Sequence, residues 1–189
     1  MPEVKKVPHI IVFVDDEPEV LRAFERDLRL WLTRNNLMLE TVSSAQECLD
    51  LLKEKSEEIS MVITDLRMPN MKGSDLLLTI SKEYPDIGRI LITAYTDMDE
   101  ITKAVDASIN NLIMKPWDPS LLSSALNRTL EYLRIKRSNT QYLLELDQQL
   151  KDAGEFQHTL LRQGPPQIEG VQFDMASWPA PGFYVSGDY

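Results

Sequence analysis

The sequence predicts an α/β fold built on a five-stranded parallel sheet. Short runs rich in Val, Ile and Leu alternate with amphipathic segments of helical period from residue 9 to about residue 135. Strict alternation of this kind is typical of parallel sheets that helices cover on both faces. Five strands favour the flavodoxin-like doubly wound order 2-1-3-4-5, whose functional crevice lies at the carboxyl ends of the strands. The predicted strands are residues 9–14, 37–42, 61–64, 89–93 and 111–114.

Helix start signals stand between these strands. The segments Ser44–Glu47 and Asp97–Glu100 have the residue types and spacing of capping boxes. Asp118 followed by Pro119 provides an N-cap and a suitable first helical residue. These signals predict helices after the second, fourth and fifth strands.

The composition is that of a globular protein with an acidic balance. The chain has 189 residues, is 43% hydrophobic and 26% charged, and carries a formal net charge of −10. This charge argues against a broad nucleic-acid surface, because phosphate binding needs clustered Lys and Arg. The single cysteine, Cys48, fits a reducing compartment, and it is expected to lie within a helix as a packing residue. Neither a membrane-spanning stretch nor a signal-peptide core is found, so we expect a cytoplasmic protein without a membrane partner.

Polar side chains close four of the predicted strands. Asp15 and Asp16 close the first strand, Asp65 the third, Thr93 the fourth and Lys115 the fifth. Because the carboxyl ends of parallel strands meet at one edge of a sheet, these side chains are expected to converge. Three clustered carboxylates repel one another unless a divalent cation lies among them, and an oxygen site of this kind suits Mg²⁺.

This convergence predicts a role for each carboxylate. A carboxylate can attack phosphorus once a metal cancels the repulsion from the phosphate oxygens, so Asp65 is the predicted phosphoryl acceptor. Asp16 and Asp65 are expected to bind the cation together with the backbone carbonyl of Arg67. Asp15 is expected to act directly or through a water molecule.

Lys115 and Thr93 are the predicted phosphate ligands. Lys115 is expected to pair with the carboxylates and then with a phosphate oxygen, which the Thr93 hydroxyl also contacts. A cis bond between Lys115 and Pro116 would aim the ammonium group into the site. The segment 68–73 predicts a rigid turn after the acceptor strand, in which Gly73 allows an unusual backbone angle.

A heptad pattern extends beyond the predicted domain. Apolar and aromatic residues recur at alternating spacings of three and four, which predicts a coiled coil of about four heptads and a homodimer. Asn139 falls at an inner position, where a polar residue specifies register at a cost in stability. The alternative is a helix that packs on its own domain. The residues of this stripe are Tyr132, Ile135, Asn139, Tyr142, Leu146, Gln149, Ala153, Phe156 and Leu160.

Four motifs together resemble the receiver domain of two-component response regulators, over about residues 8–135. The resemblance implies phosphotransfer from a sensor histidine kinase to Asp65, dependence on Mg²⁺ and slow self-catalysed dephosphorylation. It also implies switch roles for Thr93 and Lys115. The motifs are VDDE at 14–17, TDLRMPNMKG at 64–73, LITAY at 91–95 and MKPW at 114–117.

One position departs from that pattern. Many receivers carry an aromatic switch residue three positions before the lysine, where this chain has Leu112. The usual coupling between the hydroxyl and the aromatic residue is therefore in question. Tyr95 or Trp117 is an alternative for that role, although each is better explained as a packing residue.

The C-terminal segment is similar to the opening of bacterial PP2C-like (SpoIIE-type) phosphatases. In that class a Gly-Asp pair contributes a metal-binding aspartate, which the resemblance assigns to Asp188. The chain ends one residue later, without the other metal ligands, so we expect it to be cut from a longer phosphatase and to lack that activity itself. The alternative is a disordered tail. The predicted organisation is a receiver domain at 1–135, a coiled-coil linker helix at 136–163 and this segment at 164–189.

Two other function classes share part of the pattern. A haloacid-dehalogenase-like phosphatase also uses an Asp nucleophile and Mg²⁺, but it usually needs DxD at the first strand, whereas Asp15 and Asp16 are adjacent. An FMN-binding flavodoxin-like domain needs a Ser/Thr/Gly-rich loop there, and residues 15–17 would repel its phosphate. The leading hypothesis is a non-enzymatic phosphoacceptor that relays its state through a coiled-coil dimer to an output domain.

Overall fold

The structure is a computed structural model that describes residues 8–94, 102, 105–161, 169–170 and 184. Each predicted strand is present, with bounds within two residues of those expected. In chain order the described elements are β1 (Ile10–Val14), α1 (Pro18–Asn35), β2 (Met38–Val42), α2 (Ala45–Lys55), the short 3-10 helix η1 (Ser56–Glu58), β3 (Ile59–Asp65), α3 (Gly73–Glu83), β4 (Gly88–Thr93), β5 (Asn111–Met114) and α5 (Pro119–Leu161).

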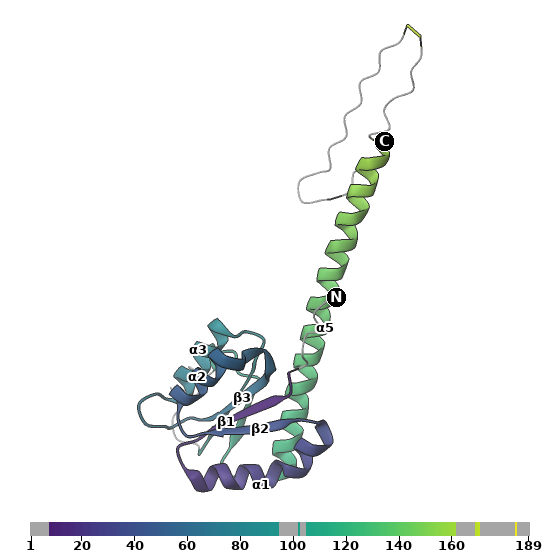
Figure 1. The fold of residues 1–189 in the computed structure, drawn as a ribbon. Coiled ribbons are helices and arrows are strands. Elements are labelled where there is room, and N and C mark those ends of the chain that lie inside the picture. Colours follow the sequence, from purple (N-terminus) through teal and green to yellow (C-terminus); the bar gives the residue numbers. More distant parts are fainter. Residues whose placement is uncertain (1–7, 95–101, 103–104, 162–168, 171–183, 185–189) are drawn as a thin grey trace. The chain divides into compact units, whose positions relative to one another are not determined.

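The strands form one parallel sheet in the order β2-β1-β3-β4-β5 (Figure 1). β1, β3 and β4 are buried along their whole length, which explains why they read as continuous apolar runs rather than as alternating patterns. The predicted fold class, a flavodoxin-like doubly wound sheet followed by a long helix, is confirmed.

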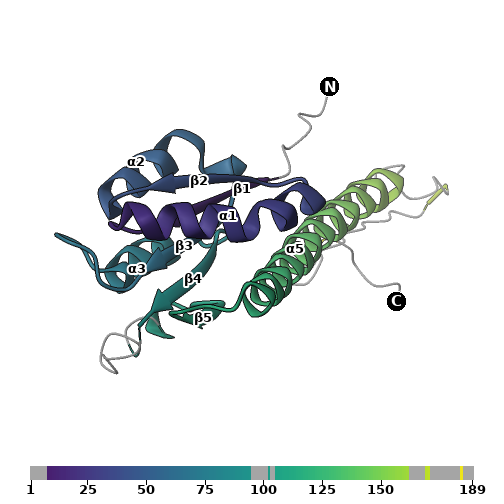
Figure 2. The same cartoon turned by 90° about the horizontal axis from the view of Figure 1, so that it is seen from below.

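Helices cover the sheet on both faces. α1 and the first part of α5 pack on one face, and α2 and α3 pack on the other (Figure 2). Successive strand residues serve opposite faces, so Val12 packs with the α2 and α3 side while Phe13 stacks on Phe24 of α1. Cys48 is buried among the apolar residues of α2, and burial raises the pKa of its thiol to about 12, so its predicted core role is confirmed.

The predicted helix caps are only partly those observed. Ser44 Oγ accepts a hydrogen bond from Glu47 N at 3.2 Å, as the capping box requires. The Glu47 carboxylate, however, accepts from Ser43 N at 2.9 Å, so it reaches one residue further back than the N-cap. Asp118 caps α5 as predicted, because its Oδ1 accepts from two backbone N–H groups at 2.8 and 3.0 Å. The Asp97–Glu100 capping box lies outside the described residues.

α5 is one continuous helix of 43 residues. The chain forms two compact units, Met1–Ile135 and Lys136–Tyr189. Leu122, Leu126 and Leu130 are buried within the first unit. None of the helices in the described part of the chain is both long enough and apolar enough to cross a membrane.

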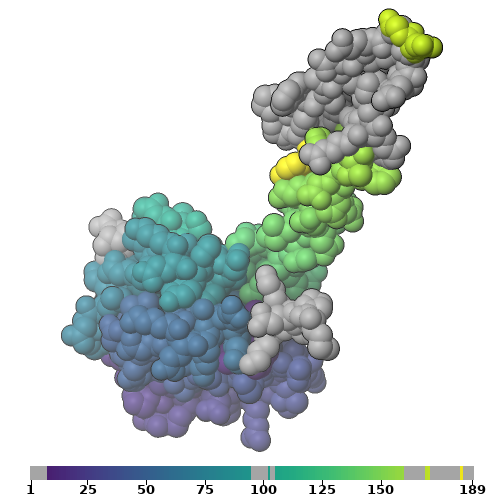
Figure 3. Space-filling model, turned by 45° about the horizontal axis from the view of Figure 1, so that its top comes forward, coloured from purple at the N-terminus to yellow at the C-terminus, as the bar shows by residue number. Residues whose placement is uncertain are grey.

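Large apolar side chains lie exposed along the second unit's part of α5. Tyr142, Leu143 and Phe156 are 65%, 63% and 67% exposed. They belong to the stretch of α5 that Figure 3 draws in green. The helix predicted from the heptad pattern is therefore present. Its pairing with a second copy stays a prediction.

Candidate functional site

The strand register brings four of the five predicted site residues to one edge of the sheet. Val14 pairs with Thr64, so Asp15 and Asp65 follow on neighbouring strands. Thr93 is the last residue of β4, and Lys115 follows β5, with its backbone N–H donating to Thr93 O at 2.7 Å. Asp15, Asp65 and Thr93 are all buried.

The ammonium group of Lys115 connects the two buried carboxylates. Its Nζ lies 2.8 Å from Asp15 Oδ2 and 2.5 Å from Asp65 Oδ1. The Lys115 side chain is only 18% exposed, so this ion pair is shielded from solvent. The Lys115–Pro116 peptide bond is cis, which confirms the conformation considered from the sequence.

Burial sets the protonation preferences of this pair. Burial raises the pKa of Asp65, and the Asp15 charge adds to that effect, while Lys115 and the backbone N–H of Arg67 act in the opposite direction. Burial alone would lower the pKa of Lys115, but its hydrogen bonds to Asp15 and Asp65 outweigh this, so the pKa is raised. Lys115 is therefore protonated at neutral pH. It lies beside the Asp65 carboxylate, whose charge is poorly stabilised by water because the group is buried.

Backbone N–H groups orient both carboxylates. Asp65 Oδ2 accepts from Arg67 N at 2.6 Å, and Asp15 Oδ1 accepts from Glu17 N at 3.0 Å. Each carboxylate thus uses one oxygen for a backbone donor and the other for Lys115. The sequence pointed to the carbonyl of Arg67 and gave no signal for its N–H.

Asp16 differs from the other carboxylates because it is exposed. No hydrogen bond or ion pair engages its side chain within the described residues. Within those residues no three His, Cys, Asp or Glu side chains form a metal-ligand group. The donor chemistry still fits a hard cation, since Asp15 and Asp65 offer only oxygen atoms at one sheet edge and Asp16 follows Asp15 directly in the chain.

Gly73 has a different purpose from the one predicted. The positive φ of the turn falls on Asn70, at 67°, and Gly73 is instead the first residue of α3. A Cβ atom on Gly73 would lie 1.9 Å from the backbone oxygen of Asp65. The prediction of an unusual backbone angle at Gly73 is therefore wrong. The missing side chain lets α3 begin against the end of β3.

Leu112 and Trp117 occupy clearly different environments. Leu112 lies in β5 and is 37% exposed. Trp117 packs edge-on against Phe24 with ring centroids 5.6 Å apart, and its Nε1 donates to Asp27 Oδ2 at 3.1 Å. Trp117 is thus a packing residue that joins α1 to the turn after β5, a contact the sequence did not reveal. Tyr95 lies outside the described residues.

Known proteins resemble this chain over the same region. The family model for the response regulator receiver domain matches residues 11–127. The hydrogenase transcriptional regulatory protein HoxA of Cupriavidus necator is 34% identical over 122 residues, which are 64% of this chain and 24% of HoxA. A chemotaxis protein CheY homolog of Campylobacter jejuni is 36% identical over 86 residues, which are 44% of this chain and 65% of that protein. The chain thus spans about a quarter of the length of HoxA.

Solved structures show the same likeness. The signal receiver domain of an HD domain-containing protein from Pseudomonas fluorescens Pf-5 is 31% identical with a TM-score of 0.62, over 67% of this chain and 98% of that one. A response regulator receiver domain protein from Clostridium thermocellum is 28% identical with a TM-score of 0.61, over 67% of this chain and 98% of its own. The family model covers more than half of the residues. The chain therefore belongs to the response regulator receiver domain family.

Proposed function

We propose that the chain is a phosphorylation switch in which Asp65 accepts a phosphoryl group from a sensor histidine kinase. Receiver domains generally take phosphate from sensor histidine kinases, bind Mg²⁺ at the phosphorylation site and act as phosphoacceptors rather than as enzymes. The observation that carries the proposal is the ion pair of Lys115 with Asp15 and Asp65. A largely shielded ammonium between two buried carboxylates contributes little net stability, so a role in binding phosphate oxygens explains it better.

The transfer follows from the position of Asp65 at the end of β3. One carboxylate oxygen attacks phosphorus, the bond between phosphorus and the kinase histidine nitrogen breaks, and that nitrogen keeps the electron pair. The product is an acyl phosphate on Asp65. Burial disfavours the free carboxylate charge at Asp65, which raises its energy before the attack.

The cation would be held by Asp16, Asp65 and the carbonyl of Arg67, with Asp15 acting directly or through water. When bound, Mg²⁺ neutralises the phosphate charge that the three carboxylates would otherwise repel. Asp16 supports this assignment because its carboxylate is exposed and has no partner among the residues described.

Lys115 and Thr93 are the residues proposed to respond. A phosphate on Asp65 offers Lys115 a stronger anionic acceptor than the carboxylate oxygen it contacts at 2.5 Å. The backbone N–H of Lys115 donates a hydrogen bond to Thr93 O, so a movement of one residue would be transmitted to the other. We propose that the Thr93 hydroxyl donates to a second phosphate oxygen.

The rest of the chain is proposed to carry the signal onward. The receiver domain, residues 1–135, would act through a coiled-coil helix at 136–163 that pairs with a second copy, with Asn139 setting the register. Residues 164–189, with Asp188, would begin a PP2C-like phosphatase output domain. They lie almost entirely outside the described residues, so this part rests on the motif resemblance.

The experiment measures phosphorylation directly. The full chain is incubated with acetyl phosphate with and without Mg²⁺, and intact mass and phosphate-affinity gels count phosphoryl groups. We expect one group, only with Mg²⁺, and none on Asp65→Asn. The control is Asp75→Asn, which changes an exposed aspartate of α3 and should label normally. Equal labelling of wild type and Asp65→Asn would overturn the assignment.

A further inference from the structure

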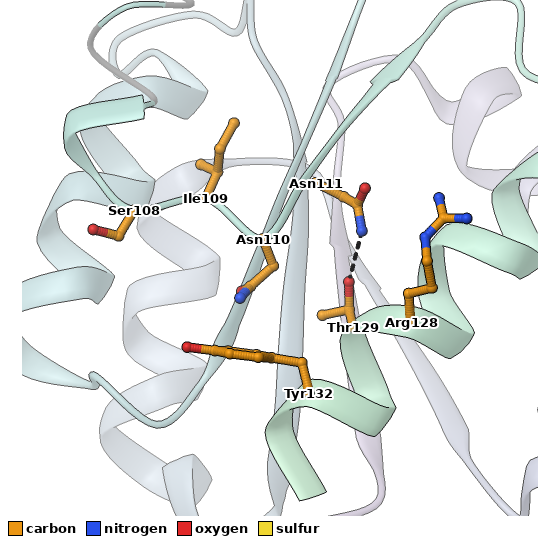
Figure 4. Close-up of a pocket in the computed structure, with 7 residues that line it drawn as sticks. All are labelled: Ser108, Ile109, Asn110, Asn111, Arg128, Thr129 and Tyr132. Atoms are coloured by element: carbon orange, nitrogen blue, oxygen red, sulfur yellow. Dashed lines mark hydrogen bonds between the residues drawn. The ribbon is translucent and has the colours of Figure 1, made fainter. Parts of the chain in front are cut away.

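A pocket lies at the other end of β5 from Lys115. It is formed where the turn before β5 meets α5, and its volume is about 480 Å³. Volumes of a few hundred Å³ are typical of small-molecule sites. Asn111 begins β5 and Met114 ends it, so the pocket and the Asp65 site occupy opposite edges of the sheet. The described residues that line it are Ser108, Ile109, Asn110, Asn111, Arg128, Thr129 and Tyr132 (Figure 4).

Hydrogen bonds hold the two asparagines of the pocket in fixed orientations. Asn111 Nδ2 donates to Thr129 Oγ1 at 3.0 Å and to Ala125 O at 3.3 Å. Asn110 Oδ1 accepts from the backbone N–H of Arg89 at 2.8 Å. These bonds leave the Asn110 amide nitrogen and the Asn111 amide oxygen to a ligand. The polar groups are therefore ordered before any ligand binds, which lowers the entropic cost of binding.

The pocket has a positively charged lining residue although the chain is acidic. Arg128 is the one charged side chain among the described lining residues, and within the described part of the chain no hydrogen bond or ion pair engages it. A second cation lies behind the turn, because the buried Arg89 guanidinium donates to the carbonyl oxygens of Ala107 and Ser108 at 3.0 and 3.3 Å. These carbonyls are neutral acceptors, but the Asp86 carboxylate acts on Arg89 electrostatically and offsets part of its charge.

The wall of the pocket offers a flat apolar surface next to that charge. Arg128 and Tyr132 are one helical turn apart on α5, and Figure 4 shows them on either side of the hydrogen bond between Asn111 and Thr129. Tyr132 is 54% exposed, and Figure 4 shows its ring beside the Asn110 amide. Ser108 has a φ of 52°, an unfavourable value for a non-glycine residue, and such strain is more frequent at binding sites than elsewhere.

We propose that this pocket binds a small anion that carries a planar ring. Arg128 would pair with its phosphate or carboxylate, the ring would stack on Tyr132, and the amides of Asn110 and Asn111 would bond to its polar edge. The guanidinium would bind the anionic half of such a ligand. The aromatic face and the two fixed amides would bind its planar half. The proposal does not depend on phosphotransfer at Asp65.

The test uses the full chain in metal-free buffer at 150 mM salt (about physiological), so that no cation recruits phosphate to the Asp65 site. Calorimetry and amide chemical shifts follow titration with AMP, GMP and 4-hydroxybenzoate. Adenosine provides the ring without the charge, and inorganic phosphate provides the charge without the ring. Binding by the nucleotides alone would identify phosphate as the recognised group. Binding by the benzoate as well would identify any oxyanion.

The variants locate the site. We expect Arg128→Gln to weaken binding of the charged ring compounds at least tenfold, and Tyr132→Leu to weaken it similarly. Arg134→Gln changes an exposed arginine outside the pocket and should bind as wild type. Several results would overturn the proposal: no binding at millimolar ligand, equal binding by Arg128→Gln and Arg134→Gln, or inorganic phosphate binding as tightly as AMP. A change of oligomeric state in Arg128→Gln would also overturn it, by indicating a protein side chain as the occupant.

Discussion

Lys115 Nζ lies 2.5 Å from Asp65 Oδ1. Asp65 ends β3 and Lys115 follows β5, so this ion pair spans the end of β4, which lies between those two strands. Lys115 only partly offsets the effect of burial on the pKa of Asp65, since that pKa is still raised. The Asp65 charge therefore destabilises the folded protein at neutral pH, and the same effect raises the energy of this carboxylate before it attacks phosphorus. Measurable consequences follow for stability, metal binding and assembly.

Asp65→Asn should stabilise the metal-free protein at pH 7, because it removes a carboxylate charge that burial disfavours. A carboxyl whose pKa is raised on folding favours the folded state only when it is protonated, so its stabilising contribution is complete below the unfolded pKa and is lost as pH rises through the folded pKa. The gain in the variant should therefore shrink as pH falls through the raised folded pKa of Asp65, and it should be absent below about 4, where Asp65 is neutral in both states. Urea unfolding at a series of pH values measures it, with Asp75→Asn as the control. A variant less stable than wild type at pH 7 would contradict this expectation.

Asp16→Ala should impair metal binding and leave folding intact. The exposed Asp16 side chain contacts no described partner, so metal-free stability should stay within about 0.5 kcal/mol of wild type or rise slightly. Mg²⁺ affinity, followed by calorimetry, should fall at least about tenfold. Glu19→Ala removes an exposed carboxylate from the first turn of α1 and should change neither quantity. A large loss of metal-free stability in Asp16→Ala would mean that Asp16 has a structural role.

Gly73→Ala should destabilise the protein by about 1–3 kcal/mol, because the new Cβ overlaps backbone atoms that cannot move independently. The overlap is with the carbonyl oxygen of Asp65, so α3 must shift away from the end of β3. Phosphorylation from acetyl phosphate should slow as the acceptor loses its fixed position. Asp75→Ala in the same helix is the matched control for helix propensity. Wild-type stability and labelling in Gly73→Ala would show that the contact is easily relieved.

The chain should be a dimer through the part of the apolar stripe that lies beyond Ile135, in the second unit. Tyr142, Leu143 and Phe156 are more than half exposed in the single chain, and pairing would bury them. Sedimentation of the full chain against a version ending at Arg134 measures the effect. A full chain that is monomeric at tens of micromolar, phosphorylated or not, would rule the dimer out.

Asn139→Leu tests the register within that dimer. Two facing amides can bond each other, whereas a leucine cannot specify partner or register, so the variant should melt at a higher temperature and form mixed oligomers. Thr140→Leu places the same side chain on the outer surface of α5 and should leave the dimer unchanged. A strictly dimeric Asn139→Leu with no gain in melting temperature would place Asn139 at the solvent-facing side.

The sequence alone was sufficient for the fold and for most of the site's location. Apolar runs determine where parallel strands lie, and parallel strands end at a common edge, so residues that follow those runs must gather there. Asp15, Asp65, Thr93 and Lys115 could be placed together for this reason. The same periodicity argument predicted the long helix that continues α5 beyond the sheet.

Only the tertiary structure decided which side chains touch. Lys115 bonds Asp15 across 100 positions of sequence, and Trp117 bonds Asp27 across 90. The role of Gly73 depends on how closely α3 approaches β3, and the exposure of Asp16 depends on how the chain leaves β1. The physical reason is that periodicity determines which face or edge a residue occupies. Contacts at ångström scale depend instead on the backbone path and on the packing of many side chains at once.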